Sequence, residues 1–513
     1  MPDDINLRAN RELIDSDFAG YKLSLASLST YSEKNIETPL TVPTLNCGYK
    51  ETKLFSLHNH LFANNSDNDV YYIDASFVIQ QIGFDLLNGI FNKSSVWELP
   101  IDHKPTYNPT LDFPSDKLAV VSDGISSIYI LEIDRENSDW KLMRKIDVDC
   151  AVVIKHSKLL GDKLHCLLYN IVENKSNLLW IEVDLLSDQF DVHKFESQGD
   201  LYFAQVIESD SILVGAEKTF FPETNEAEIK YVWSQDSDTI RVEFKVGSKA
   251  IVKDGNIQVF DKDDNVLMVG RLGGELKENS VVFNEENGTL ALTASKQVSG
   301  VKWIEFIEGL SGDYKADELE VIEANTKLSK FTTENEIYSS SSICNNADME
   351  ECDFPENNNA VIERLKKTGA THRSNLGGSK YLFNAKDSIV LQQDEDANLW
   401  ENVCESEEWR LKHVASLTAM GYIQASKQRK KIMTCSPNHD YVVISESHCH
   451  VFVYRQNHSF GGELRNRKCG KTLHQLAQQF VLNLGQDEIL GVVATDHVLY
   501  MLTEKKLFAC ILN

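Results

Sequence analysis

Short runs of β-branched and aromatic residues alternate with polar turn residues along most of the chain, which is the pattern of antiparallel strands. Residues 118–148 give the clearest example: three strands follow one another, and a tight turn through Asp123-Gly124 joins the first two. Strands that recur every 8–12 residues or so are typical of a sandwich, a barrel or a propeller. The pattern therefore predicts an all-β protein.

Units of about 40–45 residues, the length of a propeller blade, recur at both ends of the chain. The β-rich segments are residues 50–222 and 376–513, which are long enough for about seven blades. No Trp-Asp dipeptide marks the units, so the predicted β-propeller is degenerate. Residues 1–49 are expected to pack on it as an N-terminal extension. Closing both segments into one ring would remove exposed sheet edges, whereas two unrelated β domains are the alternative.

Residues 223–310 form a compact strand-rich unit between the two segments. In its first hairpin, Tyr231 and Trp233 share one face of a strand, and a turn at Gln235-Asp236 leads into a second alternating strand. Further strands and turns follow, which predicts an antiparallel sandwich of under about a hundred residues, with seven or eight strands. Residues 311–375 are acidic and rich in Ser and Asn, which favours a linker; a docked helix over Ala316 to Leu328 is the alternative.

Charge and cysteine content narrow the functional classes. The 513 residues have a formal net charge of −27, which disfavours a general binder of nucleic acid or anionic membranes. No secretory signal and no long apolar segment stand out, so no membrane partner is predicted. The 10 cysteines are scattered without a Cys-x-x-Cys pair, which is typical of a cytoplasmic or nuclear protein.

Motifs for catalysis, cofactors and metals are missing from the sequence. It contains no Gly-x-Ser-x-Gly, His-Glu-x-x-His or P-loop pattern, which predicts a non-enzyme without a cofactor. Asp261 to Asn265 imitates a calcium loop but lacks its later Gly and Glu. His448-Cys449-His450 places only two imidazoles on one strand face, so no metal site is predicted. An enzyme site assembled from separate blades on the central face stays as an alternative.

Two basic turns in the C-terminal segment suggest a docking patch for an acidic partner segment. The candidate residues are Lys427, Arg429, Lys430, Lys431, Arg465, Arg467 and Lys468. Direct nucleic-acid binding is disfavoured because no aromatic residues are interleaved with these cations. Two solvated hairpin loops are the alternative interpretation.

Several motifs of the middle unit resemble the CS domain of the NudC family. They are Tyr231-x-Trp233-x-Gln235 with the strand that follows, and the stretches 270–276, 289–293 and 296–303. The chain departs from the family pattern at Ser280-Val281-Val282-Phe283, where the family commonly has Ser-x-Trp, and by its single Trp303, where some members carry paired Trp. Stretches in both outer segments are similar to the family as well, among them Arg11 to Leu25, Met420 to Lys431 and Cys435 to Tyr441.

The resemblance implies a propeller interrupted by a CS-type antiparallel β-sandwich. It also implies a non-enzymatic adapter or co-chaperone, cytoplasmic and nuclear, that acts in protein folding and stabilisation. Its partners would be client proteins and a heat-shock protein 90 chaperone system, and a monomer is expected. The implied partner-binding residues are Tyr231, Trp233, Gln235, Phe283 and Trp303, although such an aromatic strand can equally be core. The alternative is a scaffold of a ribonucleoprotein or motor-associated assembly without a folding role.

Overall fold

The structure is a computed structural model of the whole chain, and it separates into two compact units. The first comprises Met1–Glu223 with Asn357–Asn513, and the second comprises Thr224–Glu356. The structure describes all residues except 1, 16–17, 19, 26, 35, 37–47, 65–68, 135–138, 188, 223–230, 245–248, 254, 261–265, 278–279, 287–288, 304, 308–312, 315–359, 378, 386–387, 395, 406–407, 421–429, 466–471 and 513. No helix in these described ranges is long and apolar enough to cross a membrane.

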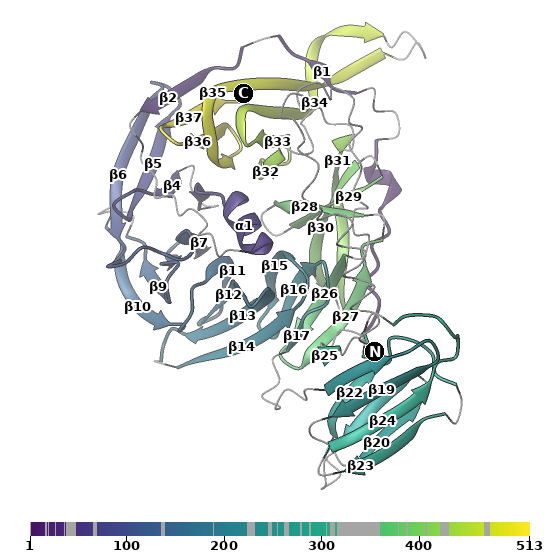
Figure 1. Ribbon diagram of the computed structural model, residues 1–513. Coiled ribbons are helices and arrows are strands. Elements are labelled where there is room, and N and C mark those ends of the chain that lie inside the picture. The colour runs from purple at the N-terminus through teal and green to yellow at the C-terminus, as the bar shows by residue number, and fades with distance from the viewer. Residues whose placement is uncertain are drawn as a thin grey trace, which may run out of the picture. The chain divides into compact units, whose positions relative to one another are not determined.

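The first unit is a ring of antiparallel blades around a short helix, α1 (Tyr49–Ser56) (Figure 1). The first blade contains β3 (Phe62–Ala63), β4 (Val70–Ile73), β5 (Val78–Asp85) and β6 (Ile90–Glu98). The second contains β7 (Thr110–Ser115), β8 (Leu118–Ser122), β9 (Ser127–Glu132) and β10 (Lys141–Asp147). The third contains β11 (Val153–Leu160), β12 (Lys163–Val172), β13 (Lys175–Asp184), β14 (Phe190–Ser197) and the short β17 (Phe221–Pro222).

The fourth blade is assembled from both sides of the inserted unit. It consists of β15 (Leu201–Glu208), β16 (Ser211–Ala216), β26 (Val361–Lys366) and β27 (Gly369–Asn375). β16 pairs with β26 from Ile212 opposite Leu365 to Ala216 opposite Val361. The sequence analysis placed 361–375 in the linker, whereas these residues form two strands. Glu363, Arg364 and Arg373 interrupt the apolar pattern there, and only pairing with β16 makes strands of the segment.

The remaining blades complete the ring. The fifth contains β28 (Lys380–Ala385), β29 (Ser388–Gln393), β30 (Asp396–Glu405) and β31 (Glu408–Leu417). An eight-stranded sheet makes the last two, with β32 (Lys430–Cys435), β33 (Tyr441–Glu446), β34 (His448–Arg465), β35 (Thr472–Ala494), β36 (Val498–Thr503), β37 (Lys506–Ile511), β2 (Thr30–Lys34) and β1 (Lys22–Leu23). The long β35 is shared, because it pairs with β34 up to Glu488 and with β36 from Ile489. The described strands thus form seven blades, which confirms the predicted propeller.

The N-terminal segment is built into the propeller. β2 pairs with β37, Thr30 opposite Cys510, and so supplies the outer strand of the last blade. Nearer the N-terminus, Asp3 N–H donates to Thr371 O (2.9 Å) and Arg373 N–H donates to Asp3 O (2.8 Å). A 3₁₀ turn, η1 (Arg11–Leu13), follows. Pairing of a strand from one end of the chain with a strand from the other closes the ring, and β2 covers the edge that β37 would otherwise expose.

The core of the propeller lies between neighbouring blades. β8 illustrates why its residues are all apolar or small: every one of them is buried. Ala119 and Val121 pack toward the first blade, whereas Val120 packs toward the third. Because successive side chains of a strand point to opposite faces, an inner strand between two blades must be apolar on both faces. Each buried Val or Ile contributes about 1.5–3 kcal/mol by leaving water.

The second unit consists of two antiparallel sheets around one core. The larger sheet has the order β23 (Val282–Glu286), β24 (Thr289–Ser295), β19 (Thr239–Phe244), β18 (Tyr231–Gln235) and β25 (Asp313–Tyr314); only β25 runs parallel to its neighbour. The smaller contains β20 (Lys249–Lys253), β21 (Asn256–Phe260) and β22 (Val266–Arg271). In the described part of this unit the two sheets make an eight-stranded sandwich, and its assignment to the CS type stays a prediction. The alternative helix at Ala316 to Leu328 and the calcium-like turn at Asp261 to Asn265 fall outside the described residues.

Candidate functional site

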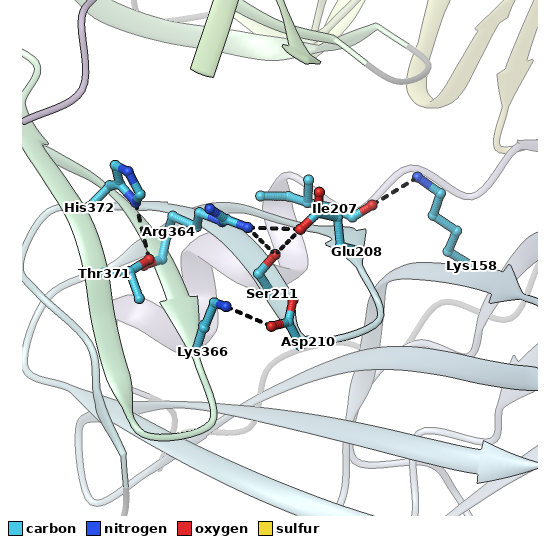
Figure 2. A network of polar contacts seen from close by, with 9 residues as sticks. All are labelled: Lys158, Ile207, Glu208, Asp210, Ser211, Arg364, Lys366, Thr371 and His372. Carbon is cyan, nitrogen blue, oxygen red and sulfur yellow. Dashed lines mark hydrogen bonds and ion pairs between the residues drawn. The ribbon is translucent and has the colours of Figure 1, made fainter. Parts of the chain in front are cut away.

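A polar network crosses the fourth blade of the propeller, as Figure 2 shows. Arg364 Nη2 donates to Glu208 Oε2 (2.8 Å) and to Ser211 Oγ (3.2 Å), so it ties β26 to the turn between β15 and β16. Beside it, Lys366 Nζ lies 2.6 Å from Asp210 Oδ2. These pairs join residues that precede the insertion to residues that follow it, and so hold the two halves of the fourth blade together.

A buried carboxylate reinforces the same blade. Glu363 is 1% exposed. Its Oε2 accepts from Phe220 N–H (2.9 Å), and its Oε1 accepts from Arg373 Nε (2.6 Å). Burial raises the pKa of Glu363, and the two hydrogen bonds counteract this rise because they favour the ionised form. The carboxylate therefore has a structural task, which is to hold the end of the pre-insertion segment against β26 and β27.

The aromatic residues implied as partner-binding by the family resemblance lie in the core of the sandwich. Tyr231, Trp233 and Trp303 are buried in one cluster with Phe306, and Phe283 packs against that cluster while half-buried. Burial raises the pKa of Tyr231 to about 12. Of the two possibilities left open by the sequence, the structure places Tyr231, Trp233 and Trp303 in the core.

Gln235 holds the backbone of Trp303 and the side chain of Lys296 by hydrogen bonds in the same unit. Its Nε2 donates to Trp303 O (2.8 Å), and its Oε1 accepts from Trp303 N–H (2.9 Å) and from Lys296 Nζ (2.8 Å). Lys296, which is 2% exposed, also donates to the carbonyl oxygens of Asp236 (2.7 Å) and Val301 (2.8 Å). Tyr-x-Trp-x-Gln thus positions two core rings and the backbone of a third aromatic residue.

Accessible apolar side chains on the sandwich lie elsewhere. Val282 on β23, and Val298 and Val301 after β24, are about half exposed, as is Ile251 on β20. β23 is the last strand of its sheet in the described part of this unit. The sequence analysis did not single these residues out, because the sequence does not show which apolar residues of a strand or turn stay exposed.

The predicted basic patch lies largely outside the described residues. Lys427, Arg429, Arg467 and Lys468 fall in undescribed segments, and for Lys430 and Arg465 only the strand positions on β32 and β34 are described. Lys431 is described, and its side chain is 7% exposed. Its Nζ lies 2.7 Å from Glu488 Oε1. The docking patch stays a prediction, and Lys431 faces inward, away from solvent.

His448, Cys449 and His450 line an open hollow with Ser447. His450 Nδ1 lies 3.3 Å from Glu446 Oε2. Cys449 has a backbone φ of 68°, so this stretch departs from a regular strand. Among the described residues, no group of three or more His, Cys, Asp or Glu side chains could hold a metal ion.

A cavity of about 380 Å³ lies against α1 of the propeller. It is lined by α1 and the segment after it, by β7, β11 and the start of β15, and by Tyr169 of β12. On the α1 side, Lys53 Nζ lies 2.7 Å from Asp200 Oδ2, and Lys50 Nζ lies 4.0 Å from Asp200 Oδ1. Lys50 Nζ also donates to Gln198 O (2.6 Å). The two lysines anchor α1 on the loop before β15.

Further basic groups gather around the same cavity. Burial lowers the pKa of Lys155, on β11, to about 8. The pKa of His58 lies well below its usual range because of burial, and His60, Lys155 and Lys431 lower it further. The rings of His58 and His60 meet edge to face, with their centres 4.4 Å apart. Sequence reasoning missed this cluster, because Lys155 lies about a hundred residues after His58 and His60 and the three residues share no motif.

Comparison with known proteins gives relatives that match almost the entire chain. No family model matches it. NudC domain-containing protein 1 of Xenopus laevis is 28% identical, over 98% of this chain and 97% of that protein. The protein of the same name from Mus musculus is 27% identical, over 99% of this chain and 98% of its own. These matches confirm the predicted resemblance to the NudC family.

Solved structures overlap this chain with low TM-scores. The nuclear movement protein from E. cuniculi GB-M1 is 20% identical and covers 15% of this chain and 98% of its own, with a TM-score of 0.14. The β-propeller domain of Myceliophteria_thermophila Cps50 (Swd1) is 8% identical over 94% of this chain and 100% of its own, with a TM-score of 0.36. The fold assignment therefore rests on the blades themselves. The propeller fold and the names of the relatives support a protein-interaction role and point to a scaffold without catalysis.

Proposed function

We propose that this relative of NudC domain-containing protein 1 is a non-enzymatic adapter with co-chaperone activity. In this proposal the sandwich, as a CS domain, binds partly folded client proteins, and the propeller provides a second docking face. The resemblance to the NudC family supports the folding role. We further propose that the protein acts as a monomer in the cytoplasm and the nucleus, together with a heat-shock protein 90 chaperone system.

One structural observation carries the proposal: the sandwich is inserted into a blade that is complete without it. β16 and β26 pair directly, with Ala216 opposite Val361, although more than a hundred residues separate them in the chain. The ion pairs of Arg364 with Glu208 and of Lys366 with Asp210 span the same junction. A rigid propeller with a separately folded module on one blade suits a protein that brings two partners together.

The sandwich offers two features through which it would bind a client. Val282, Val298 and Val301 expose apolar surface, which can contact the apolar segments of an unfolded chain. β23 lies at the edge of its sheet in the described part of the unit, and an edge strand can pair with an extended peptide. The aromatic core behind these residues, with Trp233 and Trp303, keeps the binding sheet rigid.

The proposal is tested by measuring the aggregation of a heat-labile client by light scattering in the presence of the full chain. We expect the full chain to suppress scattering at an equimolar ratio. A variant in which residues 224–356 are replaced by a short Gly-Ser linker should lose the effect. The double variant Val282→Glu, Val298→Glu should weaken it, and Ile251→Glu on the smaller sheet is the matched control. Unchanged scattering with the full chain, together with no client recovered by affinity capture, would refute the co-chaperone role.

The same variants separate this proposal from the alternative scaffold without a folding role. A scaffold predicts that the full chain captures its partners from lysate but leaves client aggregation unchanged. The co-chaperone predicts both capture and suppression, with the sandwich needed for suppression. Comparing partners captured by the full chain with those captured by the variant lacking 224–356 shows which unit selects them.

A further inference from the structure

The cavity against α1 combines an apolar wall with an uncompensated positive charge. Leu54, Leu57, Leu61 and Phe62 line one part of it. Its volume of about 380 Å³ falls within the range of small-ligand sites, roughly 300–1,000 Å³. Such sites are mostly apolar and contain a few polar groups that orient the ligand.

The charged groups of the lining do not cancel. The lining contains three lysines, Lys50, Lys53 and Lys155, and two carboxylates, Asp112 and Asp200. Asp200 is shared by Lys50 and Lys53. Asp112 Oδ2 accepts from Ser157 Oγ (2.7 Å) and from Ser157 N–H, so the hydrogen bonds of this carboxylate link β7 to β11 of the next blade.

Lys155 is the lysine of the lining that pairs with neither carboxylate. Among the described residues, no carboxylate or carbonyl oxygen accepts a hydrogen bond from its amine. Its Nζ lies 5.1 Å from the centre of the Tyr169 ring, which offers only a cation–π contact. A half-buried ammonium in this position loses part of its hydration without gaining a counter-ion, which is costly unless something else supplies the negative charge.

A second polar group at the cavity is also without a partner. His58 Nε2 is buried and makes no hydrogen bond in the described structure. The neighbouring ring of His60 fixes the orientation of His58 by edge-to-face packing. Because burial and the surrounding cations keep its pKa low, His58 is neutral at physiological pH, and its Nε2–H tautomer can donate one hydrogen bond.

We propose that this cavity binds the carboxylate group of an organic ligand, with Lys155 as its ion partner and His58 as a hydrogen-bond donor. The charge balance selects a monoanion, because one negative charge neutralises the lining whereas a phosphate dianion would leave it negative. The apolar wall takes the organic part of the ligand. Lys431, a further cation that lowers the pKa of His58, is already paired with Glu488. The carboxylate belongs either to a free small acid or to an acidic side chain of a partner peptide.

The test measures binding to the full chain by calorimetry and by ligand-observed NMR. Benzoate represents a free monocarboxylate, and benzamide is its neutral counterpart. A blocked pentapeptide with one central glutamate among glycines represents an acidic side chain, and its glutamine version is the control. Inorganic phosphate tests for a general anion site. We expect benzoate or the glutamate peptide to bind saturably, at least about tenfold more tightly than its neutral counterpart, as expected for one charge-assisted contact. Which probe binds identifies the source.

Two variants locate the site. Lys155→Met should weaken binding about tenfold or more, and His58→Phe should weaken it several-fold, because each removes one polar contact. Lys158→Met is the matched control on the same strand: its Nζ donates to Ile207 O (3.4 Å), and it does not line the cavity. Circular dichroism confirms that each variant is folded. Four results would each overturn the proposal. Two concern the probes: equal binding of the acid and its neutral counterpart, or tighter binding of phosphate than of either carboxylate probe. The others are unchanged binding in Lys155→Met and no saturable binding of any probe.

Discussion

Replacement of Lys155 by methionine is expected to stabilise the propeller, although the residue is central to the proposed binding site. Methionine keeps an unbranched apolar side chain of similar length but carries no charge. In the folded protein, burial lowers the pKa of Lys155 from its ordinary value of 10.5 to about 8. At neutral pH the amine is still mostly protonated, so the folded state contains a charge that the unfolded chain would solvate better.

The size of this cost follows from the pKa. Moving it from 10.5 to about 8 corresponds to a free energy of up to about 3 kcal/mol, at 1.36 kcal/mol for each pH unit. Water that enters the cavity solvates the ammonium in part, which reduces the gain expected for Lys155→Met to about 1–3 kcal/mol at neutral pH.

The gain has a characteristic pH dependence. Because the folded pKa lies below that of the unfolded chain, the unfolded chain binds more protons between about pH 8 and 10.5, and wild-type stability rises with pH across this window. The advantage of Lys155→Met should therefore be full below about pH 8 and shrink toward pH 10.5. Urea unfolding followed by tryptophan fluorescence at about pH 7 and pH 10 measures it.

Lys158→Met serves as the control, because its amine lies outside the cavity. It should change stability by less than about 1 kcal/mol, without the same trend. Destabilisation by Lys155→Met, or a gain that is the same at both pH values, would refute the reasoning that Lys155 is a half-buried cation without a counter-ion.

Three further predictions concern the propeller. Glu363→Ala should lower the free energy of unfolding by about 3–5 kcal/mol in urea titrations, because it leaves the Arg373 guanidinium half-buried without its partner; a loss below about 1 kcal/mol would contradict this. Gly215→Ala should cost about 1–3 kcal/mol in the same assay, because a Cβ there would collide with the ring of Phe203. Gly161→Ala is the comparison: a Cβ there would meet open space, so this variant measures the cost of backbone strain without a collision. Burial lowers the pKa of His60 to about 3, so the unfolded chain binds the proton first, and stability should fall as pH drops from about 6.5 toward 3. In His60→Phe the urea midpoint should change less with pH across that range. An unchanged dependence of the midpoint on pH would count against a buried neutral imidazole.

The strand content and the number of blades could be predicted from local pattern. In β8, Leu118–Ser122, every residue is apolar or small because the strand is covered on both faces, and such a run is visible in the sequence. The hairpin of Tyr231–Gln235 with Thr239–Phe244 could be predicted for the complementary reason: one face is buried, so apolar and polar residues alternate. Both the continuous apolar run and the alternating pattern reflect which faces of a strand are buried by neighbouring strands, and hydrophobic periodicity shows this directly.

Long-range pairing could not be predicted from the same signals. Val361–Lys366 contains three charged residues and was placed in the linker, yet it pairs with β16 and lies among buried residues. Its charges are tolerated because each finds a partner that is distant in sequence: Glu363 accepts from Phe220 N–H, Arg364 donates to Glu208, and Lys366 donates to Asp210. Similarly, Thr30–Lys34 became a blade strand only because the end of the chain offers the edge of β37.

The sequence by itself determined the all-β class, the split of the propeller by an inserted sandwich, and the resemblance to the NudC family. Only the tertiary structure decided which side chains are accessible: it buried Tyr231 and Trp233 in a core and left Val282 exposed at an edge. Only the tertiary structure, too, brought His58 and Lys155 to one cavity. The physical reason is that a strand pattern depends on neighbours within a few residues, whereas charge balance and access depend on groups that the ring brings together from separate blades.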